Sequence, residues 1–453
     1  MRRVLLAAAV PAILLVGNLA TRALLLHAPG RFAGDLAQPL PVVTAWDGYG
    51  AQAFAIFALT LAAAAVAAFL YASAIREAVP ELSSERTTWL CAIASAIAAL
   101  AWPVAYSSDV YAYAAYGEMA LHGLDVYLPV PAAFHAPFVD LARRQWSGTF
   151  PPCVYGTLFI ELARGLVALF GRDPVSTLLA FRALAAATWL GAAYVFSLLA
   201  RHWFPERRAA ALALFALNPL AVWCAAEGHN DALMVLVALL GTFAVARGAF
   251  LGGGLVLGLT PLLKAVGTAA AVPLALYVAA RATPRSALLV WIGYGAGLAG
   301  AAVLLAGPMW PALTALRLHG TYAPQASLQS LTGAIPGLAL AGLAALTGLR
   351  ALARGDGAGA LWLALAVPLA LPNPYPWYMM WVLPVAAAAR GPAGAWLWIG
   401  TIAGSLRYLP DALGPLRSDS NVLAASLSLI PFAVVAIVLL RAPAARAQAS
   451  LSR

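Results

Sequence analysis

The sequence predicts an all-α polytopic membrane protein, and two observations support this. Of its 453 residues, 63% are hydrophobic, and the mean hydropathy is +0.86, which is more apolar than a soluble protein of this length needs to be. Apolar runs of the roughly 20 residues that a spanning helix requires also recur along almost the whole chain. We attribute the formal net charge of +10 to cytoplasmic loops rather than to nucleic-acid binding, because basic residues collect in such loops.

The first three spans are predicted at 4–26, 49–75 and 87–106. The apolar run 152–170 is treated differently, because it contains Glu161 and Arg164. An ionised pair in hydrocarbon is costly, and counting this run as a span would put an arginine-rich loop outside, against the positive-inside rule. We therefore predict an amphipathic helix that lies along the membrane interface.

The remaining spans follow from the same hydropathy pattern. They are predicted at 174–200, 209–226, 229–247, 250–264 with 265–281 as a broken hairpin, 286–307, 331–352, 359–372, 376–390, 393–409 and 421–441. The total is about 12–14 transmembrane helices, with both termini cytoplasmic. The three cysteines give neither a zinc spacing nor a disulfide framework.

Polar residues of this topology gather on the outer face, whereas the inner face carries short arginine-rich loops. A transporter would instead be expected to hold its polar site near the midplane, in two related halves, and no internal repeat is evident. This asymmetry favours an enzyme that acts on a lipid-linked substrate at the outer boundary. A transporter or flippase of a lipid-linked sugar is the alternative.

Transfer of a sugar from a lipid phosphate needs one carboxylate to accept the proton of the attacking hydroxyl. Asp109 is the preferred base, because it directly follows a predicted span, at a depth where burial is expected to raise its pKa. A helix cap is the competing interpretation of this residue. Asp47, which follows Trp46, is the alternative base, although Asp-Gly is also typical of a turn.

The transfer also needs a cation for the departing phosphate. Lys264 stands alone in an apolar run, so it either binds phosphate or extends its amine to the interface. His229, Asn230 and Asp231 open another apolar run, as a hydrogen-bonding cluster for a sugar or as helix caps.

Arg407 and Arg417 are the other cationic candidates. Trp377 and Tyr378 either pack against a sugar ring or belong to an interfacial aromatic belt. The sequence contains no DxD, HExxH or CxxC pattern, so it gives no support for a metal site, and no cofactor is expected.

Several motifs, in their order along the chain, resemble bacterial GT-C-fold glycosyltransferases. The closest resemblance is to the polyprenol-phosphate-mannose-dependent α-1,6-mannosyltransferases. The residues that carry it are 108–118, 122–127, 150–156, 218–219 with 228–234, 262–264, and 376–378 with Trp381. The chain departs from the family pattern at Val126, where relatives have proline, and at Cys153, which interrupts a proline-rich run.

The resemblance implies a GT-C-type fold and a division of one membrane domain, 1–453, into three parts. These are a two-helix N-terminal extension (1–86), a catalytic core (87–285) with an outer loop (107–173), and C-terminal helices (286–453) that complete the donor and acceptor sites. It also implies that Asp109 is the catalytic base. The surrounding substrate-binding residues are expected to include Tyr111, Tyr113, Glu118 and Tyr127.

The implied reaction is inverting transfer from a β-linked polyprenyl phosphate sugar to a glycan or glycolipid acceptor. Mannose is the expected sugar, and arabinose or glucose are alternatives that need the same hydroxyl-binding groups. The resemblance places the protein in the bacterial inner membrane, with its active site facing the periplasm and membrane lipid as its surroundings. No nucleic-acid partner is expected.

Overall fold

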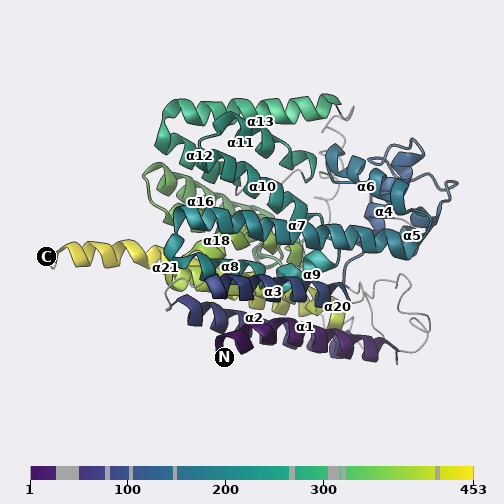
Figure 1. Ribbon diagram of the computed structural model, residues 1–453, viewed down its shortest axis with the longest axis horizontal. Helices are drawn as coiled ribbons and strands as arrows, with labels where there is room; N and C mark the ends of the chain where they lie inside the picture. Colours follow the sequence, from purple (N-terminus) through teal and green to yellow (C-terminus); the bar gives the residue numbers. More distant parts are fainter. Residues whose placement is uncertain are drawn as a thin grey trace. The chain divides into compact units, whose positions relative to one another are not determined.

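The computed structural model describes residues 2–26, 50–76, 82–101, 106–145, 150–264, 271–304, 317, 323–413 and 419–451. The predicted all-α fold is confirmed in these ranges, where nearly all regular structure is helical (Figure 1). Asp47 and Arg417 lie outside the described residues. The described chain forms two compact units, Met1–Tyr322 and Ala323–Arg453.

The first unit contains the predicted outer loop and Lys264. Its helices are α1 (Arg2–Leu26), α2 (Gly50–Arg76), α3 (Leu82–Leu100), α4 (Asp109–Leu121), α5 (Pro137–Gln145), α6 (Thr157–Phe170), α7 (Pro174–Trp203), η1 (Pro205–Arg207), α8 (Arg208–Ala216), α9 (Pro219–Ala226), α10 (Asp231–Ala246), α11 (Phe250–Gly258), η2 (Thr260–Leu262), α12 (Ala271–Ala282) and α13 (Pro284–Leu304). The second unit contains α15 (Leu328–Thr332), α16 (Ala334–Ala353), α17 (Ala358–Ala370), η3 (Pro376–Trp381), α18 (Leu383–Ala388), α19 (Gly391–Ala403), η4 (Gly404–Tyr408), α20 (Leu409–Leu413) and α21 (Ser420–Leu451).

Six of the described helices are long and apolar enough to cross a membrane, which confirms a polytopic membrane protein. They are α1, α2, α7, α13, α16 and α21. The bent pair formed by η1–α8 and α9 would be a seventh. The other predicted spans correspond to shorter or interrupted helices. Where a continuous span was expected at 376–390, η3 and α18 are each far shorter than the roughly 20 residues that a span needs.

The break between α8 and α9 has a local cause. Pro219 has no N–H and cannot continue the hydrogen-bond pattern of α8, and Asn218 Oδ1 accepts a hydrogen bond from Ala221 N at 3.0 Å. The chain therefore ends one helix and caps the next, with a bend of 49°. This bend leads directly into the loop that carries His229.

Two arginines in the predicted spans bind carbonyls at helix ends. Arg22 Nη1 donates to Ala101 O at 2.9 Å, and Arg182 Nη2 donates to Leu100 O at 2.9 Å, both at the end of α3. Arg182 Nε also donates to Ala226 O, at the end of α9, at 2.6 Å. The last carbonyls of a helix have no partner within the helix and favour a positive charge, so these arginines connect the ends of several helices.

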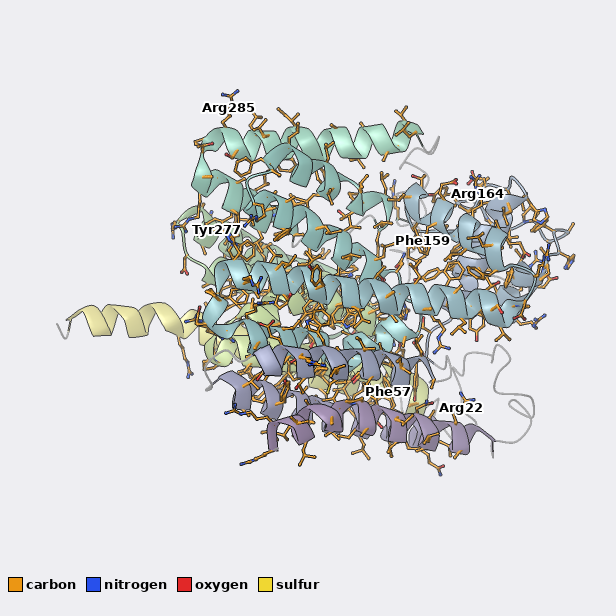
Figure 2. All side chains as sticks on the ribbon, viewed as in Figure 1. Arg22, Phe57, Phe159, Arg164, Tyr277 and Arg285 are labelled. Carbon is orange, nitrogen blue, oxygen red and sulfur yellow. The ribbon has the colours of Figure 1, made fainter. Side chains whose placement is uncertain are left out.

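The outer loop folds into a small group of three helices, α4, α5 and α6, next to the start of α7 (Figure 1). Predicted to lie apart from the spans, α6 buries Phe159, Ala163 and Val167 on one face. Its other face carries Arg164 (Figure 2), which is 50% exposed and pairs with Glu161 at 2.7 Å. One buried face and one charged face are what the amphipathic prediction requires.

Candidate functional site

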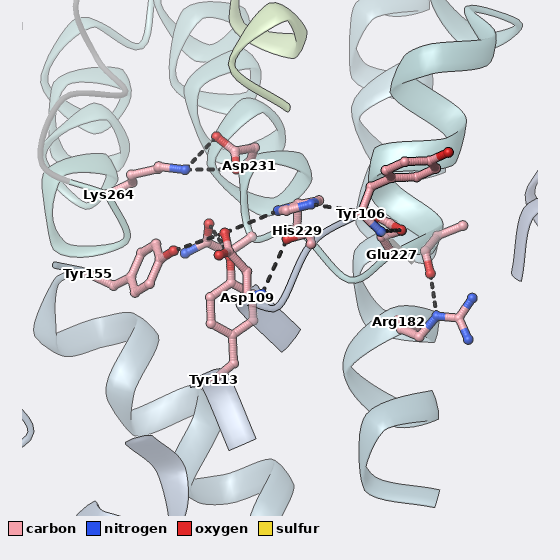
Figure 3. A network of polar contacts seen from close by, with 12 residues as sticks. Tyr106, Asp109, Tyr113, Tyr155, Arg182, Glu227, His229, Asp231 and Lys264 are labelled. Atoms are coloured by element: carbon pink, nitrogen blue, oxygen red, sulfur yellow. Dashed lines mark hydrogen bonds and ion pairs between the residues drawn. The ribbon is translucent and has the colours of Figure 1, made fainter. Parts of the chain in front are cut away.

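Asp109 is the first residue of α4, but its carboxylate does not cap the helix. Its Oδ2 atom accepts hydrogen bonds from the hydroxyls of Tyr155, at 3.3 Å, and Tyr113, at 3.4 Å, and lies 3.5 Å from His229 Nδ1 (Figure 3). Ser108, at the N-cap position, makes no side-chain capping bond with any described residue. The carboxylate is thus directed into a polar cluster and not at the backbone of the helix.

Tyr155 reaches Asp109 because its segment is joined to the segment that carries Lys264. Tyr155 and Lys264 form an isolated antiparallel bridge, and Gly156 N donates to Leu263 O at 3.3 Å. The two backbones come so close at Gly156 that a Cβ atom there would lie 2.2 Å from Leu262 O. Glycine is needed at this position to bring the tyrosine and the lysine together.

His229 lies in the loop between α9 and α10 and faces Asp109. Gly228 precedes it with φ +96°, a left-handed conformation that favours glycine. On the other side of the ring, Nε2 lies 3.8 Å from Glu227 Oε2. Glu227 is 2% exposed, and its Oε1 accepts a hydrogen bond from Tyr106 N at 3.5 Å. The imidazole therefore lies between two carboxylates.

The expectation of a raised pKa for Asp109 is wrong. Burial acts to raise the pKa of this carboxyl, but the hydrogen bond and charge of His229, the charge of Lys264 and the hydrogen bond of Tyr155 outweigh burial and hold the pKa below 3.8. Burial also acts to lower the pKa of His229, but Asp109 and Glu227 outweigh it and raise the pKa above 6.5. Both residues lie in segments that connect the spanning helices. The charge on each of them favours the charged form of the other.

Lys264 and Asp231 form a buried ion pair next to this cluster. Lys264 Nζ donates to both carboxylate oxygens of Asp231 at 2.8 Å, and the side chains are 7% and 0% exposed. Lys264 does not extend its amine to the interface, which was the competing interpretation. Asp231 is the first residue of α10, and its neighbour Asn230, at the N-cap, makes no side-chain capping bond with any described residue.

The side-chain amide of Asn230 provides a hydrogen-bond donor that no described residue accepts from. Its Oδ1 atom accepts from the Tyr113 hydroxyl at 3.4 Å. Its Nδ2 atom is buried and has no hydrogen-bond partner among the described residues. A buried donor without a partner is costly, so this amide nitrogen is suited to bind an oxygen of a substrate.

The other predicted residues of the outer loop have different surroundings. Tyr127 donates from its hydroxyl to Tyr155 O at 3.1 Å and so supports the segment that carries Tyr155. Tyr111 is 1% exposed and belongs to the apolar core of α4. Glu118 Oε2 accepts hydrogen bonds from the backbone N–H groups of residues 138 and 139, at 2.8 and 2.9 Å, in the first turn of α5. The position of Glu118 fits a residue that holds the loop.

The predicted residues of the second unit form a cluster of their own. Arg407 is 4% exposed, donates from Nη2 to Gln325 Oε1 at 2.8 Å, and places its guanidinium 4.9 Å from the ring centre of Tyr375. Tyr375 stacks on Trp377 at 4.6 Å, and Tyr378 contacts Trp377 at 5.8 Å. Trp377 is 4% exposed, which does not fit a lipid-facing aromatic belt.

The sequence did not single out Glu227 and Tyr155 as site residues. Glu227 carried a usable signal, since it is a carboxylate two residues before His229. Tyr155 lies 46 residues after Asp109, and only the fold shows that the two meet. The assembled cluster offers one carboxylate within reach of two hydroxyls, an imidazole held between carboxylates, and a buried lysine, which are the groups that proton transfer beside an anion requires.

Most of the first unit matches a known family. Residues 13–281 match the family model described as "Alpha-(1->6)-mannopyranosyltransferase, N-terminal domain", of the MptA_B family. Asp109, His229, Asp231 and Lys264 lie inside this range, and Arg407 lies outside it.

Two curated mycobacterial proteins are similar to part of the chain. One is "Alpha-(1->6)-mannopyranosyltransferase Rv1459c" of Mycobacterium tuberculosis (strain ATCC 25618 / H37Rv), 32% identical over 158 residues, which are 32% of this chain and 25% of that protein. The other is a "Probable alpha-(1->6)-mannopyranosyltransferase" of Mycolicibacterium smegmatis (strain ATCC 700084 / mc(2)155), 32% identical over 158 residues, which are 32% of this chain and 26% of that protein. The match spans about a quarter of each relative's length. No solved structure matches the chain.

Proposed function

The chain belongs to the MptA_B family of alpha-(1->6)-mannopyranosyltransferases, and from this premise we propose that it transfers mannose from a polyprenyl phosphate to a glycan or glycolipid acceptor. The transfer takes place at the outer face of the inner membrane, and it inverts the configuration of the sugar. The observation that carries this proposal is the position of Asp109, whose carboxylate is directed at Tyr155, Tyr113 and His229.

Asp109 is the general base of the proposed reaction. The acceptor hydroxyl gives its proton to the carboxylate while its oxygen attacks the anomeric carbon from the face opposite the phosphate. The bond between that carbon and the phosphate oxygen breaks, and its electron pair leaves with the polyprenyl phosphate. One displacement turns a β-linked donor into an α-linked product, so a single base is sufficient.

Lys264 is the proposed phosphate contact in the first unit. The departing phosphate gains negative charge, and a buried ammonium stabilises such charge strongly. Asp231 holds the ammonium in place with two hydrogen bonds of 2.8 Å. Asn230 Nδ2, which has no partner among the described residues, donates to a sugar oxygen.

The test of this proposal is Asp109→Asn in purified protein, with synthetic polyprenyl phosphate mannose as donor. Loss of a positioned base is expected to lower kcat by about 10²- to 10⁴-fold. Asp140→Asn is the matched control, because Asp140 belongs to the same outer loop but pairs with His135 and Arg143, so it should retain its activity. A wild-type rate for Asp109→Asn would refute the assignment.

The same assay can identify the donor sugar. Polyprenyl phosphates that carry mannose, glucose or arabinose are offered separately to the wild-type protein. Mannose is expected to be transferred with the highest kcat/KM. A higher kcat/KM for one of the other sugars would keep the proposed chemistry and replace the substrate.

A further inference from the structure

His229 lies between two carboxylates that come from different segments of the first unit (Figure 3). Its Nδ1 atom is 3.5 Å from Asp109 Oδ2, and its Nε2 atom is 3.8 Å from Glu227 Oε2. A neutral imidazole has one N–H donor, whereas an imidazolium has two. Only the protonated ring can therefore present a donor to both carboxylates at once.

The charges around the ring also favour the proton. Several segments contribute the described charged and titratable groups that face it or its carboxylate partners, namely Tyr106, Asp109, Tyr111, Tyr113, Tyr155, Arg182, Glu227, Asp231 and Lys264. Three of these groups are carboxylates and two are basic, so one negative charge is in excess. A protonated His229 cancels this excess, and a buried charge without compensation is costly.

We propose that Glu227 is a positioning residue, which holds His229 in its doubly protonated form so that the imidazolium orients the Asp109 carboxylate for the attack. This inference rests on the proposed role of Asp109 as the base. Glu227 acts through His229 and need not touch the substrate. The raised pKa of His229, which follows from Asp109 and Glu227 outweighing burial, supports the same conclusion.

Loss of the imidazolium proton has a predictable consequence. The neutral ring can donate to only one of its two neighbours, and the Asp109 and Glu227 carboxylates then repel one another. Asp109 stays ionised, but its orientation is no longer fixed from the His229 side. The alkaline limb of kcat/KM against pH is therefore expected to lie above pH 6.5, as the raised pKa of His229 requires.

Glu227→Gln keeps the shape of the side chain and removes its charge. The alkaline limb should move to lower pH by about 1 unit, because an opposite charge close to a titrating group shifts its pKa by at least that much. Glu227→Asp retains the charge, so its alkaline limb should lie close to that of the wild type. Glu85→Gln is the matched control, since Glu85 pairs with Arg208 at 2.8 Å, and its alkaline limb should coincide with that of the wild type.

A structural role alone gives a different result. If Glu227→Gln lowers the rate equally at every pH and leaves the alkaline limb in place, Glu227 only supports the fold and the proposal is wrong. If Glu227→Gln does not fold, the protonation state of His229 can still be measured in the wild-type protein. ¹⁵N-histidine NMR in nanodiscs, with His229→Gln to assign the signal, should show the imidazolium persisting above pH 6.5. A ring that is already neutral at that pH overturns the proposal.

The NMR measurement also separates the two proposals. If Asp109→Asn retains the wild-type rate, the base assignment fails. The protonation state of His229 is measured without turnover, so its dependence on Glu227 is tested independently of that failure. A pH-rate shift in Glu227→Gln together with an inactive Asp109→Asn supports both.

Discussion

Lys264 and Asp231 are joined by two hydrogen bonds of 2.8 Å, one to each carboxylate oxygen, with both side chains buried. The lysine follows η2 and the aspartate begins α10, so the pair connects two segments that are 33 residues apart. Removing one partner of a buried pair leaves the other charge without compensation. The pair therefore has a structural effect that any test of phosphate binding has to separate.

Lys264→Met is expected to destabilise the protein by about 3–5 kcal/mol, because it removes the ammonium that makes two buried hydrogen bonds to the charged Asp231. The double variant Lys264→Met/Asp231→Asn removes both charges and should recover most of that loss. Thermal unfolding in nanodiscs measures both effects. A single variant as stable as the wild type would show that Asp231 finds another partner.

The same two variants test the phosphate role of Lys264. If Lys264 binds the donor phosphate, the double variant stays folded and still binds polyprenyl phosphate mannose at least 10-fold more weakly, the equivalent of about 1.4 kcal/mol. Titration of the donor against each variant measures this. Unchanged donor affinity in the double variant would remove Lys264 from the phosphate role.

The lowered pKa of Asp109 predicts activity at acidic pH. The carboxylate is ionised above its folded pKa, which lies below 3.8, so the acid limb of kcat/KM is expected below that pH. Tyr155→Phe removes one hydrogen bond to the ionised form and should move the acid limb to higher pH by up to about 1 unit. The fold is checked by circular dichroism at each acidic pH, because a protein that stays folded there excludes acid unfolding as the cause of the lost activity. An acid limb well above pH 3.8 in the wild type would contradict this prediction.

Gly156→Ala is expected to destabilise the outer loop by about 1–3 kcal/mol and to lower activity. The new methyl group would lie 2.2 Å from Leu262 O, a backbone atom that cannot rotate away. Gly165→Ala, on α6, is the matched control, because nothing lies within 4 Å of its Cβ position, and it should be neutral or slightly stabilising. Equal unfolding curves for the two variants would show that the contact at Gly156 relaxes without cost.

Glu118→Ala is expected to loosen α5. It leaves two backbone N–H groups in the first turn without their acceptor, at a cost of about 1–3 kcal/mol for each buried group. Hydrogen exchange of the α5 amides should quicken. Glu161→Ala is a suitable comparison, since its pair with Arg164 is partly exposed and such pairs contribute little; if both variants exchange alike, Glu118 does not hold the loop.

The sequence predicted the helical membrane fold and most helix positions, because long apolar runs have few other structures open to them. It did not predict two of the places where these runs break. The expected span 209–226 is interrupted at Asn218 and Pro219, and the span 376–390 is replaced by two short helices. A hydropathy profile does not show such breaks, because a proline or a capping residue interrupts the backbone hydrogen bonds of a helix without making the run less apolar.

For the candidate site, the sequence supplied the polar residues but not their partners. Asp109, His229, Asp231 and Lys264 were recognised because polar residues are rare in this chain. That Asp231 would pair with Lys264, and that Asp109 would have a lowered pKa, depended on contacts across long stretches of sequence. One sequence alone does not show which distant residues come into contact.

The division into three parts at 86 and 285 stays a prediction.

The close approach of Gly156 to Leu262 also limits how this protein can be recombined with its relatives. A chimera that takes the segment around Gly156 from a relative but keeps the segment around Leu262 from this protein combines two backbones that did not evolve to pack together. Chimeras and mutant libraries should therefore carry both segments from the same parent. Inheritance of the two segments as one block is expected to separate working hybrids from misfolded ones.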